Sequence, residues 1–469
     1  MTAAAADRMS SLDAFFFYTE EDGVNHMHVG GFALVEGTAP TANEVAQALL
    51  PKLDRIPRYR QIAQPVPLHL GRPVWVDASQ FDVIRHVRST VLPESTRAAL
   101  RTELETFISQ PLERTRPLWE LLLIDAVDAD HWCIAWKIHH SMVDGVSGTE
   151  LLTILFDSAP SPSSPPTVLR AQEPRKLASK QAIVLSSVTD LVLGASRTVH
   201  SIRPATARKL SRVGRAYLGL VKQTILPDLH SPLVGNIGPE RSYDYCVVPF
   251  ADIKEIRAGL GGTVNDVVLT AVLKGFSAVL TAHGTNVSGK SLQAMVPVAL
   301  RPRDAQGRPL GDGTMETKAS ALIAKLPLDI DDPARRLRTV AERLSALKDT
   351  TQSEAITAIN EMTALLPGTV TSVALRAFSK VPQRSLHTTV TNVPGPTMTL
   401  YVLGRRITTI GNYAPPFPIG ARTSVTVYSY EGQLVFGITG DKASIPDVDV
   451  IATGIRRGID ELLAVSRGQ

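Results

Sequence analysis

The segment His139-His140-Ser141-Met142-Val143-Asp144-Gly145 places two histidines side by side at the end of an apolar run. Residues 118–126 and 132–140 have strand character, and the second run ends with the two histidines. Val127-Asp128-Ala129-Asp130, between the two runs, is typical of a turn. We therefore predict a β-hairpin whose second strand delivers His139 and His140. The rest of the chain is interpreted by whether it builds, supports or covers this segment.

Side chains on a strand alternate between its two faces, so adjacent residues point in opposite directions. His140 shares one predicted face with Ile138 and Trp136, whereas His139 shares the other face with Lys137. We therefore expect one imidazole to face a reaction chamber and the other to be held in the packing behind it. The two rings then have different roles.

The chemistry that this segment favours is proton transfer. Histidine titrates near neutral pH, which suits it to move one proton. A hydroxyl acceptor is a poor nucleophile until a base within about 3 Å takes its proton, and His140 is our candidate for that base. We expect Asp144 to lock the loop through an arginine or backbone amides, and Gly145 to let the backbone pass close by.

Two simpler explanations of the pair are a metal site and two histidines satisfied in a core. Zinc sites recruit histidines that converge on one ion, whereas adjacent strand residues diverge, so we expect no metal here. A core role is open for His139. It does not account for the pair together with Asp144 and Gly145.

His-His-Ser-Met-Val-Asp-Gly matches the HHxxxDG signature and resembles the acyltransferase superfamily that includes chloramphenicol acetyltransferase, peptide-synthetase condensation domains and bacterial wax ester synthase/diacylglycerol acyltransferases. In that superfamily the second histidine is the catalytic base, which corresponds to His140. The resemblance implies that His139 and Asp144 belong to the catalytic group as well, with Gly145 as structural support.

Further stretches resemble the wax ester synthase/diacylglycerol acyltransferase branch, including its mycobacterial triacylglycerol synthase-like members. In chain order they are Met9-Ser10-Ser11-Leu12-Asp13-Ala14, Pro117-Leu118-Trp119-Glu120, Thr263-Val264-Asn265-Asp266 and Val393-Pro394-Gly395-Pro396. The resemblance thus covers nearly the whole chain. It implies two chloramphenicol-acetyltransferase-like lobes of mixed sheet and helices, with an active-site tunnel between them and His140 near its middle.

The resemblance also implies two supporting residues. Asn265, in the first turn of a helix predicted over 263–283, would lie at the lobe interface as an amide donor near the developing oxyanion. Arg301, at the end of a strand predicted over 291–300, is the candidate partner of Asp144. An arginine at a strand end is more commonly just exposed.

Composition fits a two-domain globular protein with large cores. The chain has 469 residues, 44% of them hydrophobic, and 49 basic against 45 acidic side chains give a net charge of +4, so nothing demands nucleic acid as a partner. Its two cysteines, Cys133 and Cys246, make no disulfide framework and suggest a reducing compartment. We find no signal pattern and no run of eighteen apolar residues, so we expect a cytoplasmic protein without a membrane span.

We predict three regions in an α/β chain. Residues 1–157 form an N-terminal lobe that carries the motif, 158–241 a Pro/Ser linker and basic helical connection, and 242–469 a C-terminal lobe. Between residues 170 and 222, eleven basic side chains alternate with apolar ones. This pattern fits peripheral contact with the inner membrane or a lipid droplet, and it equally fits a helical connection with one solvated face.

The predicted function is an acyl-CoA-dependent O-acyltransferase that esterifies diacylglycerol, in triacylglycerol synthesis, or long-chain alcohols, giving wax esters. Acyl-CoA is a co-substrate, and no other cofactor is expected. Direct transfer is expected because no activated serine or cysteine is evident. Two alternatives stay open: a condensation-type acyltransferase that takes its acyl group from a carrier protein, and a non-catalytic lipid-binding protein.

Overall fold

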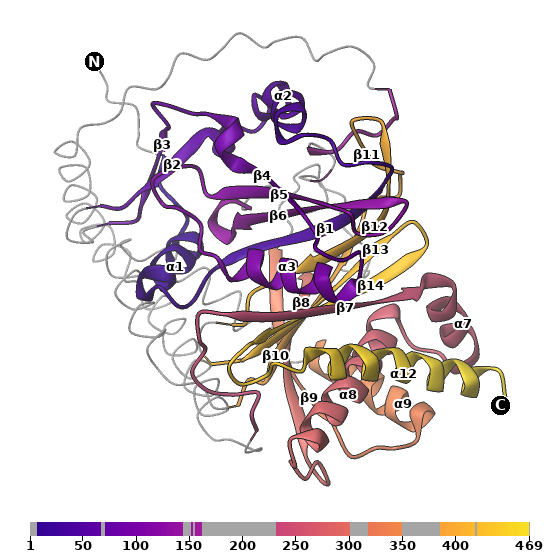
Figure 1. Ribbon diagram of the computed structural model, residues 1–469. Coiled ribbons are helices and arrows are strands. Elements are labelled where there is room, and N and C mark those ends of the chain that lie inside the picture. Colours follow the sequence, from indigo (N-terminus) through magenta and orange to yellow (C-terminus); the bar gives the residue numbers. More distant parts are fainter. Residues whose placement is uncertain are drawn as a thin grey trace, which may run out of the picture.

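The computed structural model describes residues 7–66, 71–143, 152, 155–161, 231–300, 318–348, 385–417 and 420–468. Within these residues, two six-stranded sheets form the centres of two lobes, and helices pack on both (Figure 1). The first lobe lies above the second in Figure 1. Strands and helices are mixed in both lobes, which confirms the α/β class predicted from the sequence.

The first sheet contains the predicted hairpin at its centre. Its strand order is β11-β12-β1-β6-β5-β4. The strands are β1 (His28–Glu36), β4 (Val87–Val91), β5 (Trp119–Asp125), β6 (His131–His139), β11 (Tyr401–Val402) and β12 (Arg405–Tyr413). β5 and β6 pair antiparallel, with Trp119 opposite Ile138, so the hairpin is confirmed.

The two faces of β6 pack into separate cores, as the alternation of its sequence predicts. Trp132, Ile134, Trp136 and Ile138 belong to one apolar cluster, which also contains residues of α2 (Ala42–Leu53). Cys133 and Ala135 belong to a second cluster, formed largely with α3 (Arg97–Ser109). Both faces of the central strand are therefore buried, which holds its C-terminal end in place.

Short elements complete the first lobe. They are α1 (Ser11–Thr19), η1 (Glu20–Asp22), η2 (Pro57–Arg60), β2 (Gln61–Gln64), β3 (Val74–Asp77), η4 (Val83–His86) and η5 (His140–Met142). The sequence offers Ser10 or Ser11 as the cap of a short helix through Phe17, and Ser10 caps α1 by accepting the Asp13 amide. The sequence also predicts a helix from Pro93, but α3 begins only at Arg97. The reason is that Thr96 is extended and caps α3 through the Ala99 amide.

The second sheet has the order β7-β14-β13-β10-β8-β9. Its strands are β7 (Arg241–Pro249), β8 (Ser291–Leu300), β9 (Lys318–Pro327), β10 (Thr388–Pro394), β13 (Thr423–Tyr430) and β14 (Gln433–Asp441). The hairpin predicted near the end of the chain is β13 and β14. β10 runs parallel to both of its neighbours, so this sheet is mixed.

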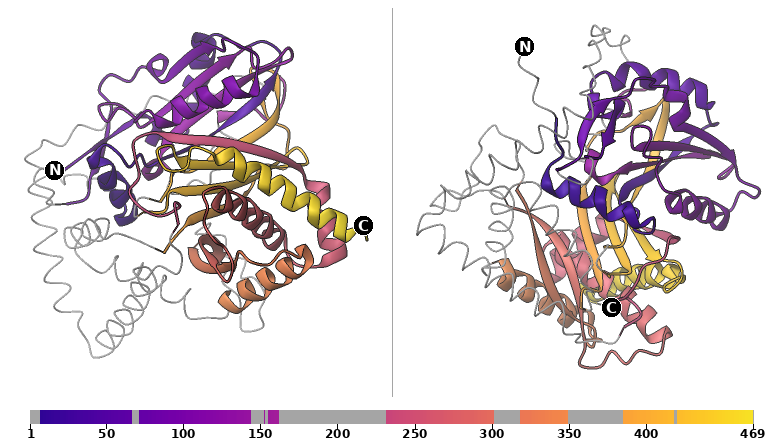
Figure 2. Two further views of the ribbon diagram at one scale, coloured as in Figure 1. Left: turned by 60° about the horizontal axis from the view of Figure 1, so that its bottom comes forward. Right: turned by 90° about the vertical axis from the view of Figure 1, so that its left-hand side faces the viewer.

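Four helices pack with the second sheet: α7 (Phe250–Leu260), α8 (Val264–Ala282), α9 (Pro333–Lys348) and α12 (Val448–Ser466). Figure 2 shows α8, α9 and α12 together on one side of the sheet. Among the described helices, α8 alone has the length and mean hydropathy of a membrane span. Two thirds of its apolar window, 67%, is buried inside the molecule, so α8 serves as a core helix.

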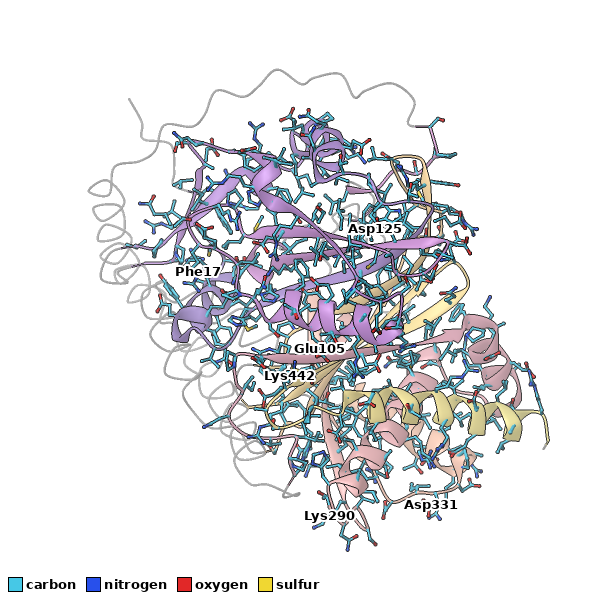
Figure 3. The ribbon with its side chains drawn as sticks, viewed as in Figure 1. Phe17, Glu105, Asp125, Lys290, Asp331 and Lys442 are labelled. Carbon is cyan, nitrogen blue, oxygen red and sulfur yellow. The ribbon has the colours of Figure 1, made fainter. Side chains whose placement is uncertain are left out.

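The lobes are joined by chain crossover and by side-chain contacts. β12 comes from the second half of the chain yet pairs with β1 in the first sheet. α3 packs against β7, and an ion pair of 3.3 Å joins Glu105 to Lys442 at this junction (Figure 3). The boundaries at 157 and 241 stay predictions. The basic segment 170–222 lies outside the described residues.

Candidate active site

The two motif histidines occupy different elements. β6 ends at His139, and His140 begins the single turn η5, so the strand stops one residue earlier than its sequence predicts. The His140 backbone N–H donates to the carbonyl of Met27 at 2.8 Å. The Val143 amide then donates back to the His140 carbonyl at 3.2 Å and closes the turn. His140 is thereby held at the end of the central strand.

His139 is fully buried. Its Nδ1 accepts the backbone N–H of Ser141 at 3.1 Å and lies 2.7 Å from the Ser141 hydroxyl. Because Nδ1 accepts, the ring proton sits on Nε2, which lies 3.5 Å from Oε2 of Glu20. Ser141 thus packs against His139, on the side away from the candidate base His140.

His140 is half-buried, and its imidazole lies against an aromatic ring. The centroids of the His140 and Phe16 rings are 4.1 Å apart, with an interplanar angle of 38°. Phe16 clusters with Phe15 and Met27, and α1, which also carries Phe17 (Figure 3), packs against η5. The candidate base is therefore bordered on one side by apolar groups from the N-terminal helix.

Glu20 is a buried carboxylate that faces His139. Its side chain is 7% exposed, accepts the Met27 amide, and lies 3.4 Å from Nη2 of Arg114. Burial alone would raise the pKa of Glu20, but the N–H groups of His139 and Met27 that face its carboxylate outweigh burial and hold that pKa well below its usual value. Glu20 is therefore ionised beside the motif.

His28 lies opposite His139 in the β1–β6 register. Its Nε2 donates to the Ile108 carbonyl at 2.7 Å, near the end of α3. Burial, assisted by the charge of Lys137, lowers the pKa of His28 to about 3. The ring is therefore neutral at ordinary pH and serves as a packed hydrogen-bond donor.

Lys137 is fully buried on the face of β6 that also carries His139. Its ammonium donates to the carbonyls of Phe107, at 3.1 Å, and Gln110, at 2.8 Å, and so caps the C-terminal end of α3. Glu120 lies 3.1 Å away as its counter-charge. Burial lowers the pKa of Lys137 to about 8, and Glu120 opposes that shift.

The remaining predicted site residues are Asp144, Gly145, Arg301 and Asn265. Asp144, Gly145 and Arg301 are outside the described residues, so the pairing of Asp144 with Arg301 stays a prediction. Asn265 is the second residue of α8 and is half-buried, and no described contact joins it to His140. Its neighbour Asp266 forms a capping box with Thr263, which accounts for that acid by local structure.

Sequence reasoning missed four residues that contact the motif histidines: Phe16, Phe17, Glu20 and Met27. Glu20 lies in the acidic run Glu20-Glu21-Asp22, which is typical of a solvated surface, and nothing in the sequence separates it from its neighbours. Within the described part of the chain, no group of three or more histidine, cysteine or acidic side chains could hold a metal ion.

Residues 9–268, which contain the motif and Asn265, match the wax ester synthase/diacylglycerol acyltransferase catalytic domain. The chain belongs to this family. Residues 317–463 match the C-terminal domain of the same family. The resemblance stated from the sequence is confirmed, and the chain is an acyltransferase of the wax ester synthase/diacylglycerol acyltransferase family.

Relatives of this family and solved structures resemble the chain over nearly its full length. A probable diacylglycerol O-acyltransferase of Mycobacterium tuberculosis is 29% identical over 463 residues, 98% of this chain and 96% of the relative. The wax ester synthase/diacylglycerol acyltransferase of Marinobacter aquaeolei has a TM-score of 0.66 at 21% identity, covering 98% and 100% of the two chains. A starter condensation domain of rhizomide synthetase, solved with C8-CoA, has a TM-score of 0.56 at 13% identity, covering 98% and 95%. These two structures share the fold.

Proposed function

We propose that this chain transfers an acyl group from acyl-CoA to the hydroxyl of diacylglycerol, of a long-chain alcohol, or of both. The observation that carries the proposal is the placement of the HHxxxDG histidines within the family's catalytic domain. His140 follows the central hairpin and is half-buried, while His139, the last residue of β6, is buried behind it. Diacylglycerol as acceptor is supported by the name of the mycobacterial relative.

In the proposed mechanism His140 acts as a general base in direct transfer. It takes the acceptor's hydroxyl proton while that oxygen attacks the thioester carbonyl, and the proton then goes to the departing thiolate. The products are the ester and free CoA. Phe16, packed against the imidazole, and the hydrogen bond of the His140 amide to Met27 restrict the ring's position, which favours a productive geometry.

Acyl-CoA is the proposed donor. The starter condensation domain that shares this fold was solved with C8-CoA, which supports a CoA thioester as a ligand of the architecture. The tunnel between the lobes and an oxyanion contact from Asn265 remain part of the proposal. Asn265 would donate from its side-chain amide, and it is half-buried in the first turn of α8.

The test is CoA release by the purified protein with palmitoyl-CoA, with and without diacylglycerol or hexadecanol. The matched variants are His140→Ala and His131→Ala, which removes a histidine paired with Asp128 at the opposite end of β6. We expect acceptor-dependent release, a loss of about 10²- to 10⁴-fold in His140→Ala, and normal rates in His131→Ala.

The acceptor that supports release identifies the substrate class. If neither acceptor supports release but an acylated carrier protein does, the condensation-type alternative replaces this proposal. If no donor is consumed, a lipid-binding role replaces it.

We also propose that the enzyme is cytoplasmic and meets its acceptors at the surface of the inner membrane or a lipid droplet. Leu50 on α2 and Ile84 on η4 are 41% and 38% exposed, and these two elements pack together. Arg55 and Arg85 beside them are exposed as well. Flotation with anionic vesicles tests this: binding should weaken when Leu50→Ser and Ile84→Ser are combined, and unchanged binding contradicts a role for this surface.

A further inference from the structure

Glu20 reaches both motif histidines by separate routes. One carboxylate oxygen, Oε2, lies 3.5 Å from Nε2 of His139. The other, Oε1, accepts the backbone N–H of Met27, whose own carbonyl accepts the backbone N–H of His140. A single buried side chain therefore contacts the ring of the first histidine and the residue that holds the backbone of the second.

We propose that Glu20 is a positioning residue for acyl transfer, which orients the His139 ring through Nε2–H and fixes the backbone of His140 through Met27. The inference deepens the proposed function and rests on it for the role of His140. Glu20 does not contact the reacting atoms. Its effect reaches the candidate base only through its neighbours.

The His139 ring has one position that satisfies both of its nitrogens. Nδ1 must lack a proton, because it accepts the Ser141 amide at 3.1 Å. Nε2 therefore carries the proton. It makes no hydrogen bond with the described residues, and Oε2 of Glu20 lies 3.5 Å from it. An ionised carboxylate at this point favours the tautomer that the turn requires. The 3.5 Å separation leaves room to tighten when substrate binds.

The tautomer matters because His139 shapes the turn that carries His140. If the His139 proton moved to Nδ1, it would oppose the Ser141 N–H, and the contact that starts η5 would be lost. His140 is the first residue of η5, so its backbone would move with that turn. Displacement of a base by about 1 Å can cost about 100-fold in rate.

Only a carboxylate satisfies the donors that surround Glu20. The Met27 amide, the His139 ring and Arg114 all present N–H groups to it. A glutamine has one accepting oxygen and an NH₂ group, so its NH₂ would face the N–H group of one of these neighbours, with no acceptor between them. Glu20→Gln is therefore an isosteric change that removes the second acceptor and the charge together.

Arg114 also contacts the Glu20 carboxylate. Its Nη2 donates to the Phe17 carbonyl at 2.7 Å and lies 3.4 Å from Oε2 of Glu20. Its guanidinium also lies 4.3 Å from the centre of the Phe17 ring. These contacts tie η1 to α1, the helix that places Phe16 on His140. The N-terminal segment therefore supports both histidines.

The kinetic test compares Glu20→Gln with Glu20→Asp and with Glu94→Gln, the same change at an exposed glutamate. We expect kcat to fall about 10- to 100-fold in Glu20→Gln, while KM for acyl-CoA stays within about twofold. Glu20→Asp keeps the charge and should recover part of that loss, and Glu94→Gln should match the unmodified protein. Melting temperatures of all four proteins show whether each variant is folded.

A second readout does not depend on activity. In protein labelled with ¹⁵N-histidine, the His139 ring should give the pattern of the Nε2–H tautomer, assigned by its disappearance in His139→Ala. Glu20→Gln should shift this ring signal or mix the two tautomers. A side chain that merely stabilises the fold would lower the melting temperature and leave the ring signal unchanged.

Two results overturn the inference: Glu20→Gln with kcat within twofold of the unmodified protein, or Glu20→Gln with slow turnover but an unchanged His139 signal. Failure of the proposed function looks different. In that case the unmodified protein releases no CoA with either acceptor, and the ring signals still decide whether Glu20 orients His139.

Discussion

The ammonium nitrogen of Lys137 lies 3.1 Å from Oε2 of Glu120, although the Lys137 side chain is fully buried under α3. The pair lies on the face of β6 that also carries His139. Arg116, at 3.0 Å, and Arg88, at 3.5 Å, approach Glu120 as well. β6 is thus fixed to α3 by a charged network that extends from the buried Lys137 to the partly exposed Arg116 and Arg88.

Replacing Lys137 by methionine should destabilise the protein. The change removes the cap on α3 and one counter-charge of Glu120, and breaking a buried pair costs about 3 kcal/mol even though Arg116 remains. Chemical denaturation should show a lower midpoint for Lys137→Met, while Lys290→Met, at an exposed loop, should behave normally. Equal midpoints for the two variants would show that the buried pair contributes nothing.

Stability should fall in acid because of His28. Its pKa is about 3 in the folded protein and near 6.5 in the unfolded chain, so only the unfolded chain binds this proton between those pH values. Stability from His28 is therefore complete above pH 6.5 and is lost as the pH falls toward 3, by about 1.4 kcal/mol per pH unit. Urea unfolding at pH 6.5 and 4.5 should show a smaller change for His28→Gln. A pH dependence identical to that of the unmodified protein contradicts the assignment.

Removing the Phe16 ring should lower kcat in addition to destabilising the protein. Phe16→Ala removes the ring that lies 4.1 Å from the His140 imidazole, and we expect kcat to fall about tenfold as the base loses its fixed orientation. Phe15→Ala is the matched control, because Phe15 packs in the same cluster and against Phe16, whose ring is the one that lies on the His140 imidazole. Both variants should lose stability, by about 3 kcal/mol. A kcat equally low in both would attribute the effect to general loosening of α1.

The crossing of α8 and α12 should not tolerate a methyl group at Gly454. A Cβ added there would lie 2.6 Å from the Cα of Gly275, a backbone atom that cannot move without separating the helices. We expect Gly454→Ala to cost about 1 to 3 kcal/mol through overpacking. Thr453→Ala, at the exposed neighbouring position, should not. A melting temperature unchanged by Gly454→Ala would contradict so close a crossing.

The sequence alone determined the elements that local physics controls. Residues 118–140 predict their hairpin because two apolar runs flank a polar turn, and the alternation within β6 correctly separates its two faces. α8 follows from the helical spacing of its apolar residues. The motif identified the family before any geometry was known, because four fixed letters and several further stretches matched in order.

The tertiary structure decided what non-local contacts control. β12 joins the first sheet although its residues lie some 370 positions after β1, and no local pattern encodes a partner at that separation. Glu20 and Lys137 are charged, so sequence patterns favour a solvated position for both. Each is buried only because the folded chain brings hydrogen-bonding or oppositely charged side chains to it. His139 and Arg114 contact Glu20, and Glu120 contacts Lys137.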